Sequence, residues 1–306
     1  MKNRKRSARL GLKFFMLSCI VPLLLMPAAT TARAQQRLVF NDTLPPPAVK
    51  STAPEDDKDD DDEDDDFIVP NRPGTAGPAE FHRPGVLQAD FGYDGSFHAQ
   101  DSSTQQTLFM DLRFAVSRRL LLEFDLDNLY SQTDEQGTRV TGVGNSRVGL
   151  QLVAVSEGEG RPAQAFAYFL TLPTASVSKG LGTGRFDHKF IWLVSKNTDK
   201  TEINFNAAYL LQGRAEGGGW LHGGQGSLSL WREVTKRLGI QGEFSGQSID
   251  EAQPRGLYAT GALTYKANRR LAFDAGMRFG LNPSAPRLGV FAGTTIGVAD
   301  FFKKRH

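Results

Sequence analysis

The chain of 306 residues is long enough for one large barrel or two small domains. Its formal charge at pH 7 is +2 and no strongly basic face appears in the sequence, which argues against nucleic acid as a partner. The one cysteine, Cys19, leaves no pair for an intrachain disulfide, and the 32 glycines and 21 phenylalanines suit closely spaced strands with an aromatic exterior.

Residues 1–34 predict a cleavable secretory signal peptide. They carry seven basic residues and no acidic one, with an apolar core at 14–26 and the small-x-small pattern Ala32-Arg33-Ala34. A single membrane anchor is one alternative, but Pro22 interrupts an apolar run that is shorter than the roughly 20 residues of a spanning helix. A lipoprotein signal is another, but the apolar run continues past Cys19. We therefore expect export of the mature chain.

Residues 35–84 predict a disordered, solvated tail rich in Pro and Asp. Within it, residues 55–66 hold eleven acidic side chains in twelve positions, which repel one another and bury no apolar surface. An arm that weakly binds calcium or a partner is the alternative, because carboxylate oxygens suit hard cations. The run lacks the glycine and the spaced ligands of a defined calcium loop.

From residue 85 onward apolar residues alternate with polar or small ones, as at Leu87, Ala89, Phe91 and Tyr93. Twelve such runs predict an all-β chain, an antiparallel up-and-down transmembrane β-barrel over residues 85–306. An even count is typical of bacterial outer-membrane barrels. The predicted strands cover 85–95, 105–115, 120–130, 140–154, 164–172, 186–195, 201–211, 224–234, 238–246, 256–266, 271–281 and 287–298.

The connections between the predicted strands differ in length according to their order. Counted from the first strand, the even-numbered connections are mostly tight polar turns, with 155–163 as the longer exception. The odd-numbered ones are mostly longer, with 282–286 as the short exception. Short turns at one end and long loops at the other are the outer-membrane pattern. We therefore predict the bacterial outer membrane as the location, with membrane lipid and the outer-membrane assembly machinery as partners.

Periodicity alone does not distinguish a soluble barrel from a membrane barrel, whose apolar face points outward. The signal peptide, the length and the sorting of the loops favour the membrane barrel. Interfacial aromatic girdles are then expected from Tyr93, Tyr130 and Tyr209 near the long-loop ends, and from Trp231 and Tyr265 near the short-turn ends.

The polar alternates of such a barrel line its lumen. Opposite charges facing across the lumen could select polar or charged solutes, or they could neutralise one another and fill the interior. Twelve strands lie between the filled barrels of about 8 strands and the open porins of about 16, so both outcomes stay open. The candidate lumen-lining residues are Asp111, Arg113, Glu123, Asp125, Asp127, Arg147, Glu243, Lys266, Asp274 and Arg278.

No catalytic, cofactor or metal site is predicted. The glycines at 180–184 are not followed by the Lys-Ser/Thr of a phosphate-binding loop, so they are expected to be structural. The five histidines are scattered without metal-ligand spacing. An outer-membrane hydrolase is the enzymatic alternative, since Ser96 and His98 lie two apart at a strand edge, with only Asp94 or Asp101 as an orienting carboxylate.

The stretch LPTASVSKGLGTGRFD resembles a family of outer-membrane transporters named for the MetA pathway of phenol degradation. The family pattern is Leu-Pro-Thr-Gly, a polar loop, Gly-Leu-Gly-(Ser/Thr)-Gly and an Asp three residues later; here Ala175 replaces the first Gly. The resemblance extends to residues 84–94 and to Asn204 and Asn206. The residues that match the motif are Leu172, Pro173, Thr174, Gly180, Leu181, Gly182, Thr183, Gly184 and Asp187.

The resemblance implies a passive channel or transporter for small solutes, hydrophobic or aromatic ones among them. Two other hypotheses stay open: a non-conducting structural or binding barrel that uses its loops and acidic tail, and the hydrolase. One feature departs from outer-membrane barrels, whose last strand usually closes on an aromatic residue, because Phe301 and Phe302 precede a basic tail. Either the last strand ends early or the assembly signal is weakened.

Overall fold

The structure is a computed structural model that describes residues 67–97, 104–134, 136–249 and 256–302. The predicted signal peptide, the acidic run at 55–66 and His98 lie outside these residues. Strands make up almost all of the described regular structure: β1 (Val86–Phe97), β2 (Thr104–Ser117), β3 (Leu120–Thr133), β4 (Arg139–Gly142), β5 (Ser146–Val155), β6 (Ala163–Leu172), β7 (Asp187–Thr198), β8 (Thr201–Gly213), β9 (Trp220–Thr235), β10 (Leu238–Ile249), β11 (Gly256–Asn268), β12 (Leu271–Gly280) and β13 (Leu288–Asp300).

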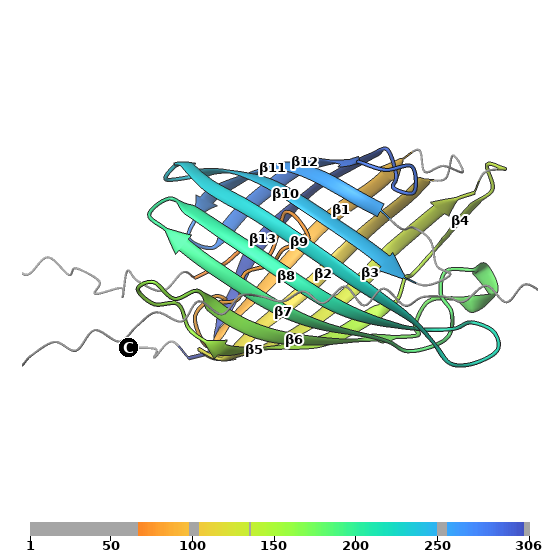
Figure 1. Ribbon diagram of the computed structural model, residues 1–306, viewed down its shortest axis with the longest axis horizontal. Helices are drawn as coiled ribbons and strands as arrows, with labels where there is room; N and C mark the ends of the chain where they lie inside the picture. Colours follow the sequence, from red (N-terminus) through yellow and green to blue (C-terminus); the bar gives the residue numbers. More distant parts are fainter. Residues whose placement is uncertain (1–66, 98–103, 135, 250–255, 303–306) are drawn as a thin grey trace, which may run out of the picture. The chain divides into compact units, whose positions relative to one another are not determined.

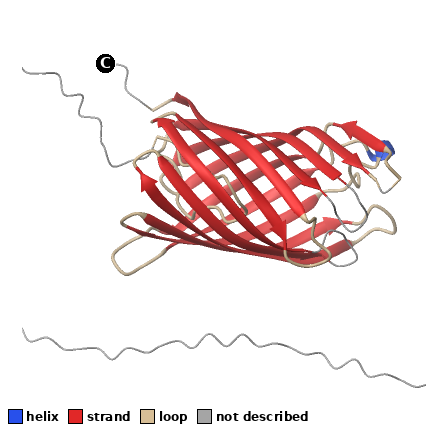
Figure 2. Ribbon diagram, turned by 90° about the horizontal axis from the view of Figure 1, so that it is seen from above, coloured by secondary structure: helices blue, strands red, loops and turns tan. Residues whose placement is uncertain are grey.

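These strands close into an antiparallel up-and-down barrel (Figures 1 and 2). Apart from β4 and β5, each strand pairs with its neighbours in sequence, and β1 pairs with both β2 and β13, which closes the sheet. Both β4 and β5 pair with β3, so they are two parts of one barrel strand that is interrupted at residues 143–145. The barrel therefore has twelve strands when β4 and β5 are counted as one, which confirms the predicted fold and strand count.

The burial pattern is the reverse of that in a soluble protein. On β3, Leu122 and Phe124 are 45% and 37% exposed, whereas Glu123 between them is 7% exposed. Phe205, Leu228 and Phe244 are likewise exposed at facing positions of β8, β9 and β10. Apolar side chains thus cover the outside of the barrel, and charged side chains point inward.

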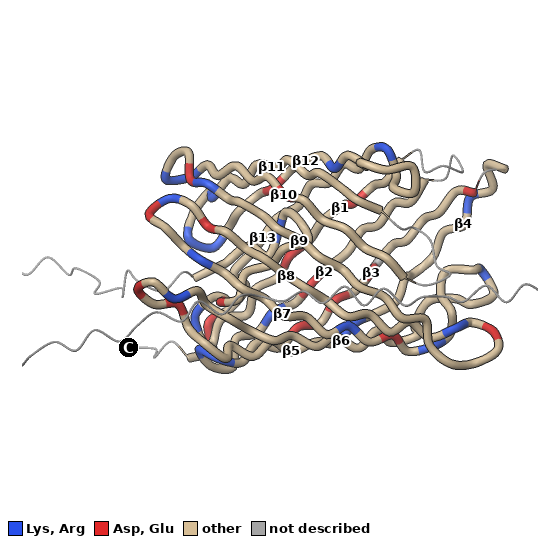
Figure 3. Tube along the Cα trace, viewed as in Figure 1, with Lys and Arg blue, Asp and Glu red and all other residues tan. Residues whose placement is uncertain are grey.

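The two ends of the barrel differ as the sequence predicts. At the short-turn end, residues 118–119, 199–200, 236–237 and 269–270 join consecutive strands, and Figure 3 shows Lys and Arg at several of these turns. The connection 156–162 is longer and is closed by a bridge between Gly158 and Arg161. At the long-loop end, the connection 173–186 contains a single turn of 3-10 helix, Val177–Lys179. No helix in the described part of the chain is long or apolar enough to span a membrane.

The last strand ends at Asp300, two residues before the second aromatic residue of the Phe301-Phe302 pair. The backbone N–H of Phe301 donates to the carbonyl of Gly85 (2.8 Å), and both rings meet Phe114 edge to face. Of the two alternatives for this end of the chain, the structure favours a strand that ends before the aromatic pair.

Candidate functional site

Residues 67–84, which precede β1, lie inside the barrel, and we call them the luminal segment (Figures 1 and 2). The sequence analysis assigned them to the tail; the structure places them among inward-facing side chains of β1, β2, β5, β7, β10 and β12. Prolines at 70, 73, 78 and 84 have no N–H and cannot continue a sheet ladder. The remaining backbone groups of the segment must therefore find side-chain partners.

The luminal segment is held on one side by Glu243 of β10. The carboxylate of Glu243 accepts hydrogen bonds from the backbone N–H groups of Thr75 (2.8 Å) and Ala76 (3.0 Å). Gly74 has a left-handed φ of +127°, and a Cβ there would lie 2.4 Å from an Oε atom of Glu243. Only glycine therefore lets the backbone approach this buried carboxylate so closely.

On another wall the segment is held at Ala79. Its N–H donates to Oγ of Ser195 on β7 (2.7 Å), and Ser195 in turn donates to Asn204 (2.6 Å). The carbonyl of Ala79 accepts from Nε2 of Gln151 on β5 (2.9 Å). Three alanines of β6 pack around Ala79, so small inward side chains make room for the segment at this level.

Near its start, the luminal segment pairs with β1 through a side-chain amide. Gln88 accepts from the N–H of Val69 (3.0 Å) and donates to its carbonyl (3.1 Å), and Arg113 donates to the same carbonyl (3.0 Å). Phe67 is buried at the short-turn end, where its ring lies 4.3 Å from the guanidinium of Arg270. The start of the segment is thus attached to the short-turn half of the barrel.

His82 of the luminal segment is a buried, uncharged histidine. Its Nε2 donates to the carbonyl of Val86 (3.1 Å), and its Nδ1 is buried without a hydrogen-bond partner. Burial, and then the positive charge of Arg113, lower the pKa of His82 to about 4. Protonation would place an unpaired buried N–H beside a guanidinium.

We therefore expect acid to loosen the luminal segment around His82. Between the ordinary histidine pKa of about 6.5 and the lowered pKa of about 4, the unfolded chain binds a proton at His82 that the folded chain does not. The free energy of unfolding is therefore highest above pH 6.5 and decreases as the pH falls toward 4. Amide hydrogen exchange of residues 67–84 should accelerate between pH 6.5 and 4.5 after correction for the intrinsic rate. In the variant His82→Gln, which does not titrate, this extra acceleration should disappear; equal acceleration in both proteins would contradict the assignment.

The charged residues predicted to line the lumen all lie at inward-facing positions. Arg147 of β5 pairs with Asp125 of β3 (2.8 Å), and Arg113 of β2 lies 3.5 Å from Glu123 of β3, so each pair joins neighbouring strands. These pairs neutralise charge along the wall. The other predicted residues at such positions are Asp111, Asp127, Glu243, Lys266, Asp274 and Arg278.

Sequence reasoning missed several charged partners in the lumen. Arg72 of the luminal segment pairs with Asp274 (3.2 Å), and Asp94 accepts from Arg278 (2.7 Å). Asp90 is fully buried, faces Asp111 across the β1–β2 pair and accepts from Thr295 (2.5 Å). Asp90 and Asp94 stand at polar alternates of the first predicted strand, so the signal for them was available. The pairing of Arg72 with Asp274 could not be predicted in this way, because Arg72 lies outside the alternating strands.

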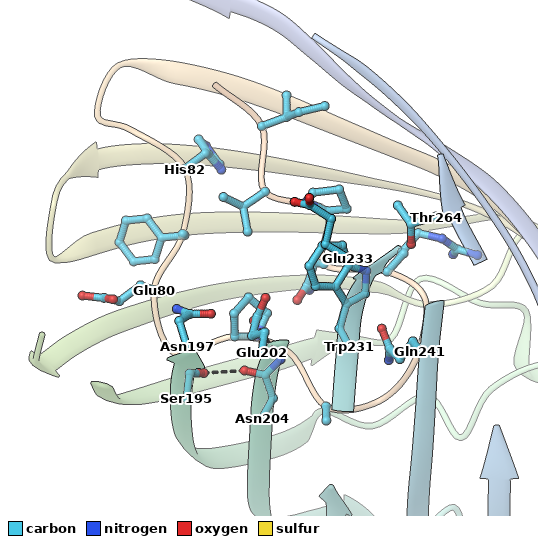
Figure 4. A pocket seen from close by; sticks show the side chains of 18 of the residues that line it. Glu80, His82, Ser195, Asn197, Glu202, Asn204, Trp231, Glu233, Gln241 and Thr264 are labelled. Carbon is cyan, nitrogen blue, oxygen red and sulfur yellow. Dashed lines mark hydrogen bonds between the residues drawn. The ribbon is translucent and has the colours of Figure 1, made fainter. Parts of the chain in front are cut away.

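A cavity of about 860 Å³ lies between the luminal segment and the wall at the short-turn end (Figure 4). The segment contributes prolines and Phe81 together with polar side chains such as Arg72 and Glu80, and the wall contributes mostly polar side chains. Trp231 borders this cavity, so the prediction that it belongs to a lipid-facing girdle is wrong. Its position on β9 follows Ser227 and Ser229, which are buried inward-facing residues, and this parity places its indole inside.

The loop motif 173–187 ties the long-loop end of the barrel together. Oγ1 of Thr174 accepts from the N–H of Ser146 (2.8 Å) and donates to the carbonyl of Gly144 (3.2 Å), across the interruption between β4 and β5. Pro173 follows the last residue of β6, and Asp187 accepts from the N–H of Gly213 (2.8 Å). Gly180 and Gly184 both have φ of +69°, and a Cβ at Gly182 would lie 3.0 Å from that of Ala175.

Replacing Thr174 with Val should loosen this loop. The substitution keeps the shape but removes both hydrogen bonds, which leaves the N–H of Ser146 without its partner at a cost of about 1–2 kcal/mol. Hydrogen exchange should rise at residues 143–146 and 173–186. The exposed loop residue Ser178 provides the control, and an equal effect of Ser178→Ala would argue against the role of Thr174.

The described residues hold no group of three or more His, Cys, Asp or Glu that could bind a metal ion. Ser96, the nucleophile of the hydrolase alternative, lies 3.4 Å from Arg278. Its suggested partner His98 lies outside the described residues.

Comparison with known proteins gives a family and a fold. A family model described as "Putative MetA-pathway of phenol degradation" matches residues 70–297. An outer membrane channel from Pseudomonas putida F1 superposes with a TM-score of 0.56 at 14% identity, over 73% of this chain and 99% of that chain. The NanC porin gives a TM-score of 0.48 at 7% identity, over 69% of this chain and all of that chain. No curated protein sequence matches the chain.

Proposed function

The chain belongs to the family described as "Putative MetA-pathway of phenol degradation", and on this premise we propose that it is an outer-membrane channel for passive diffusion of small solutes. The observation that carries the proposal is the enclosure of a charged, hydrogen-bonded interior by an apolar exterior. That arrangement is stable only where lipid surrounds the barrel. The fold shared with the channel from Pseudomonas putida F1 supports the same conclusion.

The proposal places the short turns in the periplasm and the long loops outside the cell, as in other outer-membrane barrels. Export would use the signal peptide at 1–34, and insertion would use the outer-membrane assembly machinery. The role proposed is not enzymatic. The family description, with its reference to phenol degradation, supports small hydrophobic or aromatic compounds as the solutes.

The luminal segment limits passage at the periplasmic end. It occupies the short-turn half of the barrel, where it bonds to the walls at Gln88, Ser195 and Glu243. Solutes that enter from the long-loop end must pass between the segment and the wall, or the segment must shift. Both routes favour small solutes.

Purified mature protein in planar bilayers tests the proposal. We expect discrete, small conductance steps, and proteoliposomes should admit phenol-sized solutes faster than disaccharides. Folded protein that inserts but produces neither conductance nor solute entry would overturn the channel.

A second function is favoured by one specific observation, the number of hydrogen bonds that hold the luminal segment. A barrel plugged permanently by this segment would be a structural or binding protein whose loops and acidic tail engage a partner. Solute uptake by cells that is unchanged on deletion of the gene, together with silent bilayers, would favour this second function.

A further inference from the structure

A row of four residues crosses the inner wall of the barrel from β12 to β2. Strand register places Asp274 of β12 opposite Gly293 of β13. Gly293 in turn lies opposite Gly92 of β1, and Gly92 lies opposite Phe109 of β2. The row therefore reads carboxylate, glycine, glycine and aromatic ring. The two adjacent glycines leave a flat recess between the carboxylate and the ring, and we call these four residues the recess.

The side chain of Arg72, from the luminal segment, occupies the recess. Its Nε donates to both carboxylate oxygens of Asp274 (3.2 and 3.3 Å), and its guanidinium carbon lies 4.4 Å from the centroid of the Phe109 ring. An added Cβ would lie 2.6 Å from Nη1 of Arg72 at Gly92, and 2.8 Å from its Nε at Gly293. The guanidinium therefore fills the space that the two glycines leave open.

The chemistry of the recess suits a guanidinium better than an ammonium. A guanidinium is planar, so it stacks on an aromatic face while its N–H groups point in its own plane toward a carboxylate. An ammonium is compact and more strongly hydrated, so it gains less from a flat floor and a ring. The side chain of Asp274 is only 2% exposed, and a buried carboxylate that loses its cation is strongly destabilising.

The arginines on neighbouring parts of the wall have carboxylate partners of their own. Arg113 lies 3.5 Å from Glu123, and Arg278 lies 2.7 Å from Asp94. Among the described residues, the ion pair of Asp274 is the one with Arg72. Without the Arg72 side chain, the recess would therefore hold a buried carboxylate that a cation from solution can neutralise.

The recess is within reach of a small solute. Arg72 borders the cavity of about 860 Å³ at the short-turn end, so displacing or shortening its side chain joins the recess to that cavity. Such a volume is ample for a small organic cation.

We propose that Asp274, Gly293, Gly92 and Phe109 form a binding site for small solutes that carry a guanidinium group, and that Arg72 occupies this site as an internal ligand. A guanidinium solute competes with Arg72 and, by taking its place, releases the luminal segment from β12. The inference goes beyond the proposed function, because it concerns a different class of ligand and does not depend on transport.

Binding to the full mature chain in detergent, measured by saturation-transfer NMR, tests the site. In the variant Arg72→Ala, n-propylguanidinium, which copies the end of an arginine side chain, should bind saturably. The cation n-propylammonium has the same charge and chain, and it should need at least about tenfold higher concentration. The parent protein should also need at least about tenfold more propylguanidinium than the variant, because its tethered Arg72 competes for the site.

Two glycine variants, each combined with Arg72→Ala, locate the binding. Gly92→Ala should abolish it, because the methyl group takes the place of the guanidinium. Gly261→Ala, where an added Cβ meets nothing within 4 Å, should leave it intact. Binding that never saturates, that is equally strong for the two cations, or that survives Gly92→Ala would overturn the site.

A measurement on the parent protein decides the question if Arg72→Ala does not fold. At fixed pH and ionic strength, propylguanidinium should accelerate amide hydrogen exchange of residues 67–76, whereas propylammonium at the same concentration should not. Exchange in β8 should stay unchanged, which separates displacement of Arg72 from general denaturation. Equal exchange rates with the two cations would overturn the site. A silent bilayer would refute the channel and leave this result standing.

Discussion

Removal of the luminal segment should increase the single-channel conductance of the barrel several-fold. The segment fills the short-turn half of the lumen through bonds to β1, β7 and β10, and its prolines prevent it from joining the sheet. Deletion of residues 67–82 takes these groups away and leaves Arg83, which pairs with Asp300 at the start of β1. Conductance in planar bilayers, measured with the parent protein on the same day, gives the answer.

A second variant protects this test against a folding failure. Glu243→Ala keeps the whole chain but removes the acceptor of the Thr75 and Ala76 N–H groups, so it should give frequent openings to the larger conductance. Deletion of residues 35–54 leaves the luminal segment untouched and serves as the control, with conductance close to the parent. Parent-like conductance in both the 67–82 deletion and Glu243→Ala would show that the segment does not limit passage.

Arginine on the lipid face should destabilise the barrel far more than arginine in the lumen. Leu228 of β9 is 50% exposed and lies between Phe205 and Phe244 of the adjacent strands, within the apolar band. Leu228→Arg should reduce the free energy of unfolding in lipid vesicles by about 2–4 kcal/mol if the position lies near the bilayer midplane. Reversible denaturation by guanidinium provides the measurement.

The matched control is Gln225→Arg on the same strand. Gln225 lies on the inward face of β9 with Ser227 and Ser229, so an arginine there does not enter lipid and the change in unfolding free energy should be less than about 1 kcal/mol. Equal losses in the two variants, or the larger loss at Gln225, would contradict the assignment of the faces.

The fold follows from the sequence because period-two alternation determines both the strands and their faces. The strand predicted at 140–154 is a single run by that criterion, and its interruption at 143–145 was not foreseen. The interruption depends on Thr174, which supplies hydrogen bonds to Gly144 and Ser146 from nearly thirty residues away. No pattern local to residues 140–154 carries that information.

The candidate site was less accessible from the sequence. Inward charges such as Asp125 and Arg147 follow from their parity in the sequence, and the same parity places Trp231 on the inward face although it lies near a turn. The luminal segment has no periodicity, and like the tail before it, it contains four prolines. Its partners, such as Glu243, lie more than one hundred and sixty residues away, so only the closed barrel brings them together.

The orientation of the two faces can be measured directly along β9. Single cysteines at 225–230, each carrying a spin label in lipid vesicles, report accessibility to oxygen, which dissolves in lipid, and to a water-soluble nickel complex. We predict oxygen maxima at Leu228 and Leu230 and oxygen minima at Ser227 and Ser229. Oxygen maxima at the two serines, with nickel maxima at the two leucines, would contradict a barrel that turns its apolar side chains to lipid.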